Sequence, residues 1–255
     1  MIGVCIPAHN EEAYIDLCLA SVMRAASCHG LAGEPVEIVV VLDQCSDLTA
    51  MRVAAWKVKC VTTSYRNVGM ARAAGAAYLI NAGARWLAFT DADTQVSETW
   101  LFDQIALRAP LVCGTVGVHD WSSHGAYAGL TKSKFESEYR DMDGHRHVHG
   151  ANLGVNAVVY KQSGGFHALE CGEDQSLVDR VERSGIPIAW TSRPRVITSS
   201  RAHSRVEGGF ATALRSAWTC DYEFVNILHG HASPVCRANS VPAVIDEESA
   251  SGREA

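Results

Sequence analysis

Asp91 and Asp93 stand one residue apart, directly after the apolar run Trp86–Phe89 and Thr90. Residues i and i+2 of an extended segment point to the same side, so both carboxylates can face one cation. A buried strand that ends in two acids is costly unless a positive group arrives, and a divalent metal carrying a phosphorylated ligand would serve. The alternative is a solvated loop after a core strand, where Asp is common. Alone, these residues leave the two interpretations even.

Two other polar segments follow predicted strands in the same way. Residues 7–11 follow an apolar strand at 2–6, and Asp43 follows the β-branched run 36–42. With a strand at 58–62, strands and helices alternate, which predicts an α/β fold with a parallel, doubly wound sheet. Ligands bind at the carboxyl ends of the strands in such sheets. We therefore expect these segments to meet at one edge.

The helices and the second half are predicted from the same patterns. Asn10 as a cap and apolar residues at helical spacing predict a helix through about residue 23, and an Ala-rich segment predicts one through about 81. We expect strands at 111–118, 186–190 and 195–198, a loop at 121–129, an extended run at 149–160, and helices at 132–142, 173–184 and 210–228. The polar composition after about residue 233 predicts a disordered tail at 233–255.

Six short motifs lie in one order over roughly residues 2–200: Ile6-Pro7-Ala8-His9-Asn10-Glu11-Glu12, Val40-Val41-Leu42-Asp43 through Asp47-Leu48-Thr49, Asn67-Val68-Gly69 with Ala71-Arg72, Phe89-Thr90-Asp91-Ala92-Asp93, Gly164-Gly165-Phe166, and Glu173-Asp174-Gln175-Ser176-Leu177. Each is weak alone, but together they resemble a family 2 glycosyltransferase with the GT-A fold.

The resemblance implies an architecture and an activity. The fold would be a Rossmann-like, mostly parallel sheet flanked by helices, in a single domain over residues 1–232. A nucleotide-binding half at about 1–95 would merge with a smaller acceptor-binding half at about 96–232. The enzyme would move a sugar, a hexose being expected, from a UDP- or GDP-linked donor to an acceptor hydroxyl. The sugar and the acceptor stay unnamed.

The nucleotide would bind along the first two motifs. Pro7 and Ala8 form a small-sided wall for a flat base, and Glu11 can accept a hydrogen bond from a ribose hydroxyl. Asp43 offers only acceptors, which suits the N–H of uracil or the N–H edge of guanine. The following loop departs from the family's usual glycine- and serine-containing form, because Gln44-Cys45 stands there. Helix capping alone is the alternative for the first motif.

The metal and the diphosphate would bind at the aspartate pair. Asp91-Ala92-Asp93 resembles the family's DxD motif, in which carboxylates hold Mg²⁺ or Mn²⁺ against the diphosphate. His203 lies where some metal-dependent relatives have a histidine that completes the metal shell. Arg201 and Arg205 beside it are candidates to hold the diphosphate.

Gly69 and Arg72 belong to the third motif. Arg72 lies one helical turn past Gly69 and can reach a phosphate or the base edge. The alternative is an arginine on an exposed helix face, and the sequence does not choose between the two.

Asp174 is the candidate general base, with Glu173 beside it. Inverting members of the family place a carboxylate here that deprotonates the acceptor hydroxyl, which requires hydrogen-bond reach. If the enzyme retains the anomeric configuration, Asp174 would bind the acceptor instead. A helix N-terminal acid that only interacts with the helix dipole is the alternative.

Three histidines alternate at His145, His147 and His149, so an extended segment would place their imidazoles on one face. That is metal-ligand spacing, although the lining of an acceptor pocket is the favoured interpretation. The small residues of 150–154 leave room for a sugar to approach.

The composition excludes several classes. The 255 residues suffice for a large core, and the net charge of −6 argues against a nucleic-acid-binding surface. No apolar run approaches the ~18–20 residues that span a bilayer, and residues 1–7 lack the basic region of a signal peptide. Nine cysteines without a Cys-x-x-Cys pair favour a reducing, cytoplasmic setting. A homodimer stays open.

Three other functions fit part of this pattern. A haloacid dehalogenase-type phosphatase shares the Asp-x-Asp motif, but Gln95 stands where that motif usually has Thr or Val. A nucleotidyltransferase shares the sheet, metal and nucleotide, yet its glycine-rich basic signature is replaced here by residues 7–11. A catalytically silent sugar-nucleotide-binding protein is the third, and Asp91, Asp93 and Asp174 argue against it.

Overall fold

The computed structural model describes residues 1–201 and residue 214. Several predictions lie outside these residues: the metal ligand His203, the basic Arg205, the tail at 233–255, and, apart from Leu214, the helix at 210–228. Among the described residues, no helix is long and apolar enough to cross a membrane.

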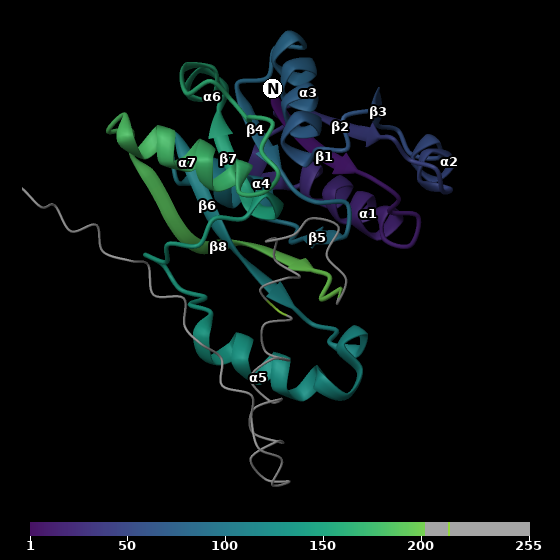
Figure 1. Cartoon of the computed structure of the whole chain (residues 1–255). Helices are drawn as coiled ribbons and strands as arrows, with labels where there is room; N and C mark the ends of the chain where they lie inside the picture. The colour runs from purple at the N-terminus through teal and green to yellow at the C-terminus, as the bar shows by residue number, and fades with distance from the viewer. Residues whose placement is uncertain (202–213, 215–255) are drawn as a thin grey trace, which may run out of the picture. The chain divides into compact units, whose positions relative to one another are not determined.

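Eight strands form one mixed sheet in the order β3-β2-β1-β4-β7-β6-β8-β5 (Figure 1). The neighbours from β3 to β4 are parallel, as are β6 and β8, whereas β7 and β5 run antiparallel to their neighbours. The predicted α/β fold with a mostly parallel sheet is confirmed. The strands are β1 (Ile2–Ala8), β2 (Val36–Asp43), β3 (Lys59–Thr63), β4 (Trp86–Phe89), β5 (Thr94–Val96), β6 (Leu111–Val118), β7 (Leu153–Asn156) and β8 (Ile188–Thr198).

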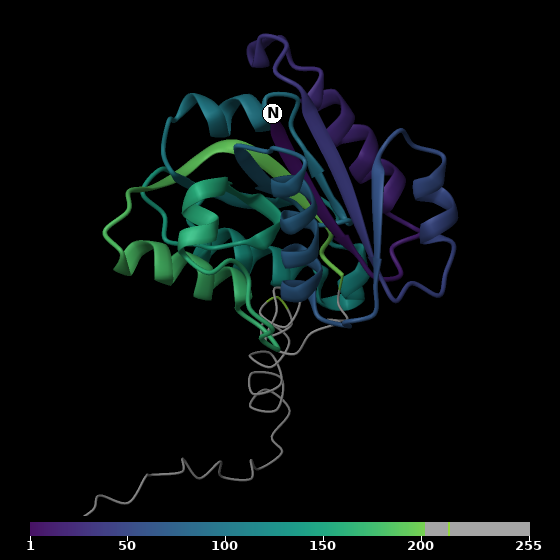
Figure 2. The same cartoon turned by 90° about the horizontal axis from the view of Figure 1, so that it is seen from above.

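Helices cover both faces of this sheet, because alternate residues of each buried strand point to opposite sides. Val4 and Ile6 pack with Leu19 of α1 on one face, while Cys5 packs with Leu79 of α3 and Leu177 of α7 on the other. Figure 2 shows α1 and α3 on opposite sides of β1 and β2. The helices are α1 (Ile15–Ala26), α2 (Thr49–Ala54), α3 (Val68–Asn81), α4 (Trp100–Ala106), α5 (Ala128–Glu138), α6 (Ala157–Gln162) and α7 (Glu173–Arg183), with short 3-10 turns at His29–Leu31, Ser122–Tyr127 and Gly150–Asn152.

The small residues of α3 let it lie close to β1. Asn67 caps its first turn by accepting a hydrogen bond from the backbone of Met70 at 2.9 Å. A Cβ on Gly75 would overlap the sulfur of Cys5, so a glycine is required for this approach. Because α3 follows the end of β3, it starts at the carboxyl edge of the sheet, where ligands bind in such folds.

The parallel register brings the predicted site segments together. Ala8 lies opposite Leu42 in β2, and Cys5 lies opposite Phe89 in β4, so β1, β2 and β4 end near one another. The segments that follow these strands, carrying Glu11, Asp43 and the Asp91/Asp93 pair, therefore leave from the same edge.

The predicted cap at Asn10 is wrong. α1 begins at Ile15, and Asn10 adopts a left-handed conformation with a φ of 54°. Its side-chain oxygen accepts a hydrogen bond from the backbone of Ser46 at 2.7 Å. Asn10 thus joins two loops at the carboxyl edge, a contact between distant residues that outweighs the local capping preference.

The second half differs in three places. The predicted loop at 121–129 contains the turn Ser122–Tyr127 and the start of α5, which runs over Ala128–Glu138 and not over 132–142. The predicted extended run at 149–160 holds only β7, because Asn156 caps α6 by accepting from the backbone of Val158 at 2.8 Å. The two short strands predicted near the end form the single strand β8, with a pairing irregularity opposite residues 114–116.

Candidate active site

Asp43 is buried at the end of β2 and organises the loop that leads into α3. Its carboxylate accepts hydrogen bonds from the hydroxyl of Thr63 at 2.9 Å and from the backbone amides of Tyr65 at 2.6 Å and Asn67 at 3.0 Å. A carboxylate has about four lone-pair positions, so one acceptor position remains for a further donor. Asp43 therefore shapes this loop as well as offering an acceptor.

The loop after Asp43 lacks the family's usual glycine and serine residues, but hydrogen bonds still hold it in place. Gln44 adopts a φ of 51°, and its amide donates to the carbonyl of Thr63 at 2.8 Å. The thiol of Cys45 donates to the carbonyl of Ala8 at 3.3 Å. Pro7 and Ala8 are buried within β1, opposite Val41 and Leu42.

Glu11 lies just beyond this wall and is buried. Its backbone amide donates to the hydroxyl of Thr49 at 2.7 Å. Both of its carboxylate oxygens accept hydrogen bonds from the same nitrogen, Nη2 of Arg201, at 3.0 and 3.1 Å. Glu11 and Arg201 are thus brought together although they lie 190 positions apart in the chain.

Asp91 and Asp93 each pair with an arginine. Oδ1 of Asp91 accepts from Nη2 of Arg72 at 2.5 Å, and Oδ2 of Asp93 accepts from Arg201 and from the hydroxyl of Ser199. Burial raises the pKa of Asp91, Arg72 opposes that shift, and the charge of Asp93 adds to it. Ala92 between them is buried.

Arg72 does not lie on an exposed helix face. Its guanidinium is buried between Asp91 and Glu173, and its Nε has no hydrogen-bond partner among the residues that the structure describes. Burial alone would lower the pKa of Arg72, but Asp91, Glu173 and Asp174 outweigh it, so the pKa is raised. A Cβ on Gly150 would overlap this guanidinium, which explains why the smallest residue stands there.

Asp174 is held at the start of α7 by backbone amides. Its Oδ2 accepts from the amide of Gly150 at 2.7 Å, and its Oδ1 accepts from the amide of Gln175 at 2.8 Å. Gly172 precedes the helix with a φ of 70°, a left-handed conformation that favours glycine. The carboxylate is partly exposed and keeps lone pairs for an acceptor hydroxyl.

Glu173 and Gly69 close the space between α3 and α7. Burial raises the pKa of Glu173, and Arg72 opposes that shift. A Cβ on Gly69 would overlap the carbonyl oxygen of His167 and press on the Glu173 side chain. Gly69 therefore permits the loop between α6 and α7 to pack closely on α3.

The rings of the three alternate histidines lie in a row beside Tyr139, and His147 stacks on both Tyr139 and His145. The ring of Tyr139 lies 4.2 Å from that of His147, and its hydroxyl and Nε2 of His149 are 2.9 Å apart. Nε2 of His145 lies 3.1 Å from the carbonyl of Cys113, and Nε2 of His147 accepts from the amide of Arg140 at 3.1 Å. These ring nitrogens bond to neighbouring protein groups, which favours a role in shaping the loop over metal binding.

The described residues offer a divalent cation oxygen ligands and negative charge, but no complete shell. Five carboxylates meet two guanidinium groups here, which leaves an excess of negative charge: those of Glu11, Asp91, Asp93, Glu173 and Asp174 beside Arg72 and Arg201. Among residues 1–201, no three His, Cys, Asp or Glu side chains are arranged to hold a metal ion. Asp91 and Asp93 therefore fit a metal whose remaining ligands come from a diphosphate.

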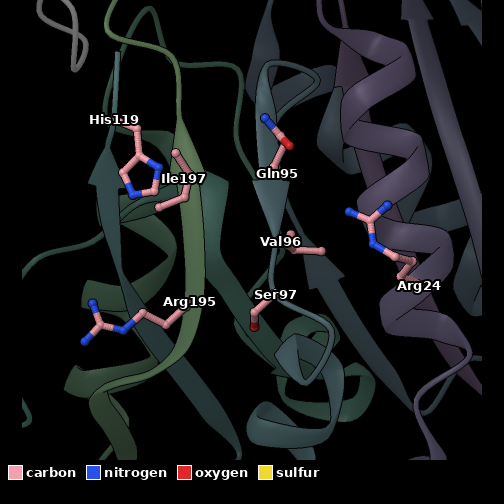
Figure 3. Close-up of a pocket in the computed structure, with 7 residues that line it drawn as sticks. All are labelled: Arg24, Gln95, Val96, Ser97, His119, Arg195 and Ile197. Atoms are coloured by element: carbon pink, nitrogen blue, oxygen red, sulfur yellow. The ribbon is translucent and has the colours of Figure 1, made fainter. Parts of the chain in front are cut away.

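A cavity of about 300 Å³ lies apart from these residues, between α1 and the β5–β8 edge (Figure 3). Its lining contains none of the predicted donor, metal or acceptor residues. In Figure 3 Arg24 projects toward β5, whereas Arg195 points away from it. The lining residues are Arg24, Gln95, Val96, Ser97, His119, Arg195 and Ile197.

Two residues of the site were not predicted from the sequence. Ser199 donates to Asp93, and its position two residues before Arg201 was the available signal. Asn67 was noted only as part of a motif, yet its side-chain amide donates to the carbonyl of Leu169 at 2.7 Å and so ties α3 to the loop between α6 and α7. That contact spans 102 positions, which no local pattern shows.

Comparison with known proteins adds independent findings. The model of glycosyl transferase family 2 matches residues 3–161. No curated protein matches the chain.

Solved structures share the fold. TarS residues 1–349 from S. aureus, in complex with UDP-GlcNAc, superimposes with a TM-score of 0.58 at 17% identity, covering 82% of this chain and 61% of that one. The mannosyltransferase PcManGT from Pyrobaculum calidifontis, in complex with GDP-Man and Mn²⁺, gives 0.57 at 17% identity, covering 91% and 65%. The chain thus spans less than two thirds of either structure's length.

Proposed function

The chain belongs to glycosyl transferase family 2, and on that premise we propose that it transfers a sugar from a UDP- or GDP-linked donor to an acceptor hydroxyl with the help of a divalent metal. One observation carries the proposal: Asp43, the Asp91/Asp93 pair and Asp174 are brought to one edge of the sheet, with Arg72 bridging the pair to α7. The UDP-GlcNAc bound to TarS and the GDP-Man and Mn²⁺ bound to PcManGT support this donor class.

The donor's nucleotide would lie over the ends of β1 and β2. Pro7 and Ala8 wall the base, the remaining acceptor position of Asp43 takes its N–H, and Glu11 takes a ribose hydroxyl. Because both uracil and guanine carry a suitable N–H edge, the assignment of UDP or GDP rests on binding measurements.

The diphosphate would lie against Asp91 and Asp93. Mg²⁺ or Mn²⁺, when bound there, stabilises the negative charge that develops on the departing nucleoside diphosphate. Arg201 supplies a positive charge at the same place, and His203, outside the described residues, is a further proposed ligand. Arg72 acts on the diphosphate only indirectly, because its guanidinium is buried against Asp91 and Glu173.

The acceptor would bind on the side of α7, with Asp174 as the base. Its two backbone hydrogen bonds fix the carboxylate without occupying every lone pair, so it can accept the proton of an acceptor hydroxyl. Glu173 holds Arg72. If the anomeric configuration is retained, Asp174 binds the acceptor hydroxyl without removing its proton.

The proposal extends to the domain halves, the compartment and the assembly. Residues 1–95 would form the nucleotide half and 96–232 the acceptor half. The cysteines in the described part of the chain are free thiols, which supports a reducing, cytoplasmic setting. A homodimer is compatible with this function.

The test is release of UDP or GDP from a panel of nucleotide sugars with Mn²⁺, Mg²⁺ or EDTA. Release by one donor class, lost in EDTA, is expected. Binding of a nucleotide sugar without release, whatever acceptor is offered, would instead favour a silent binding protein.

A further inference from the structure

Arg201 makes several polar contacts at the donor end of the site. Its Nη2 reaches both oxygens of Glu11 and one oxygen of Asp93, and its Nε donates to Ser199 at 3.2 Å. Its guanidinium carbon also lies 5.7 Å from the ring centre of Tyr14. One side chain thus connects the segment after β1, the aspartate pair and the segment after β8.

The charges explain why Arg201 is held there. The side chains of Glu11 and Asp93 are only 9% and 12% exposed, so two unpaired like charges would be costly. Burial alone would lower the pKa of Arg201, but Asp93 and Glu11 outweigh it and raise the pKa, so the guanidinium stays charged. Arg201 therefore neutralises the same carboxylates that the donor and its metal would use.

We propose that Arg201 is the resident counter-cation of Glu11 and Asp93, and that a divalent ion gains Asp93 only when the donor's diphosphate draws Arg201 away. This inference rests on the proposed function, which supplies both the ion and the diphosphate. Arg201 then pairs with the diphosphate and gives up its contacts with Glu11 and Asp93. Metal and nucleotide consequently bind together, and the metal alone binds weakly.

The experiment measures Mn²⁺ affinity without nucleotide, from the electron paramagnetic resonance signal of free Mn²⁺. Arg201→Gln removes the competing charge, so it should bind Mn²⁺ at least about tenfold more tightly than the wild type. Adding Asp93→Asn should abolish that gain. Arg195→Gln is the matched control, because Arg195 lies nearby in β8 but pairs with Asp141 at the surface, and the Mn²⁺ affinity of this variant should equal that of the wild type.

A second arm adds UDP or GDP. The nucleotide of the donor class, UDP or GDP, should tighten Mn²⁺ binding strongly in the wild type and less in Arg201→Gln. If Arg201→Gln fails to fold, Arg201→Lys keeps a charge but has no planar fork to bridge two carboxylates, and an intermediate Mn²⁺ affinity is expected.

The outcomes separate this inference from the proposed function. Equal Mn²⁺ affinity in the wild type and the Arg201 variants, with nucleotide-dependent Mn²⁺ binding intact, overturns the counter-cation role alone. No Mn²⁺ binding by any variant, even with UDP and GDP present, overturns both the counter-cation role and the metal dependence.

Discussion

Arg72 and Glu173 lie 101 positions apart in the chain and form a buried ion pair beneath Gly150. The same guanidinium reaches Asp91 at 2.5 Å. Arg72 therefore fixes the aspartate pair of the donor side relative to the first turn of α7, where Asp174 follows Glu173. One side chain thus positions the groups that we propose to bind the donor and the acceptor, and this relationship motivates the first two predictions.

Replacing Arg72 by Met leaves Glu173 as a buried acid without its ion-pair partner and removes the partner of the partly exposed Asp91. We expect a loss of about 3–5 kcal/mol in the free energy of unfolding, as when one partner of a buried ion pair is removed, and this loss comes from Glu173, because the Asp91 side chain is 34% exposed. Urea unfolding measures it. Arg85→Met is the control, because Arg85 pairs with Glu34 at the surface and should cost about 1 kcal/mol or less. Equal losses in both variants would contradict the role of Arg72.

Gly150→Ala places a methyl group against the Arg72 guanidinium. Overpacking of this kind costs about 1–3 kcal/mol, and the shift of Gly150 should also weaken its hydrogen bond to Asp174 and lower turnover. Gly129→Ala is the matched change, because a Cβ there meets no atom within 4 Å and the residue lies in α5. It should be neutral or slightly stabilising. A harmless Gly150→Ala would show that the close approach to Arg72 is unimportant.

Asp174→Asn keeps an oxygen for the Gly150 amide but removes the group that takes up a proton. Turnover should fall by about 10²–10⁴-fold with little change in donor affinity, as for other acid–base groups. Asp179→Asn on the same helix, where the carboxylate accepts from Gln175 at 2.7 Å, should keep its activity. A loss of less than about tenfold in Asp174→Asn would make this carboxylate a bystander.

His149 predicts a dependence of stability on pH. Burial lowers its pKa from 6.5 to about 4, the charge of Asp174 opposes that shift, and His147 and His145 add to it. The folded protein keeps His149 neutral, whereas the unfolded chain takes up a proton below about pH 6.5. Its contribution is therefore complete above that pH and is lost as the pH falls toward 4.

The comparison is between pH 7.5 and pH 4.5. The wild type should lose about 2–3 kcal/mol more unfolding free energy over this range than His149→Gln, which has no proton to bind there. Urea unfolding at the two pH values gives the difference. His29→Gln, at an exposed position, should behave as the wild type does. Identical losses in the wild type and His149→Gln would show that His149 is not held neutral.

Local patterns predicted β1, β2 and β4 well because these strands are short, apolar and largely buried. The β-branched run that forms β2 strongly favours a strand, and the position of Asp43 at the end of that strand followed from this prediction. The second half was harder. Asn156 ended an apparently continuous extended run by capping α6, and a single asparagine within such a run is ambiguous.

Pairings between distant residues were not predictable. Asn10 followed by two glutamates fits a helix cap as well as it fits a loop, and the backbone of Ser46 decided the outcome. Arg72 could have lain on either side of an Ala-rich helix, where the apolar pattern marks no single face. Its partners Asp91 and Glu173 lie 19 and 101 positions away, so only the folded chain reveals the bridge.

The most direct test of the central claim is calorimetric titration of UDP and GDP with Mn²⁺ into the wild type, Asp93→Asn and Asp103→Asn. Asp103 lies on α4 and accepts from the hydroxyl of Thr99 at 2.7 Å, away from the aspartate pair. The wild type and Asp103→Asn should bind one nucleotide at least about tenfold more tightly in Mn²⁺ than in EDTA, and Asp93→Asn should lose that difference. Affinity that is the same in Mn²⁺ and EDTA, or undiminished in Asp93→Asn, would contradict the assignment of this pair to the metal and the diphosphate.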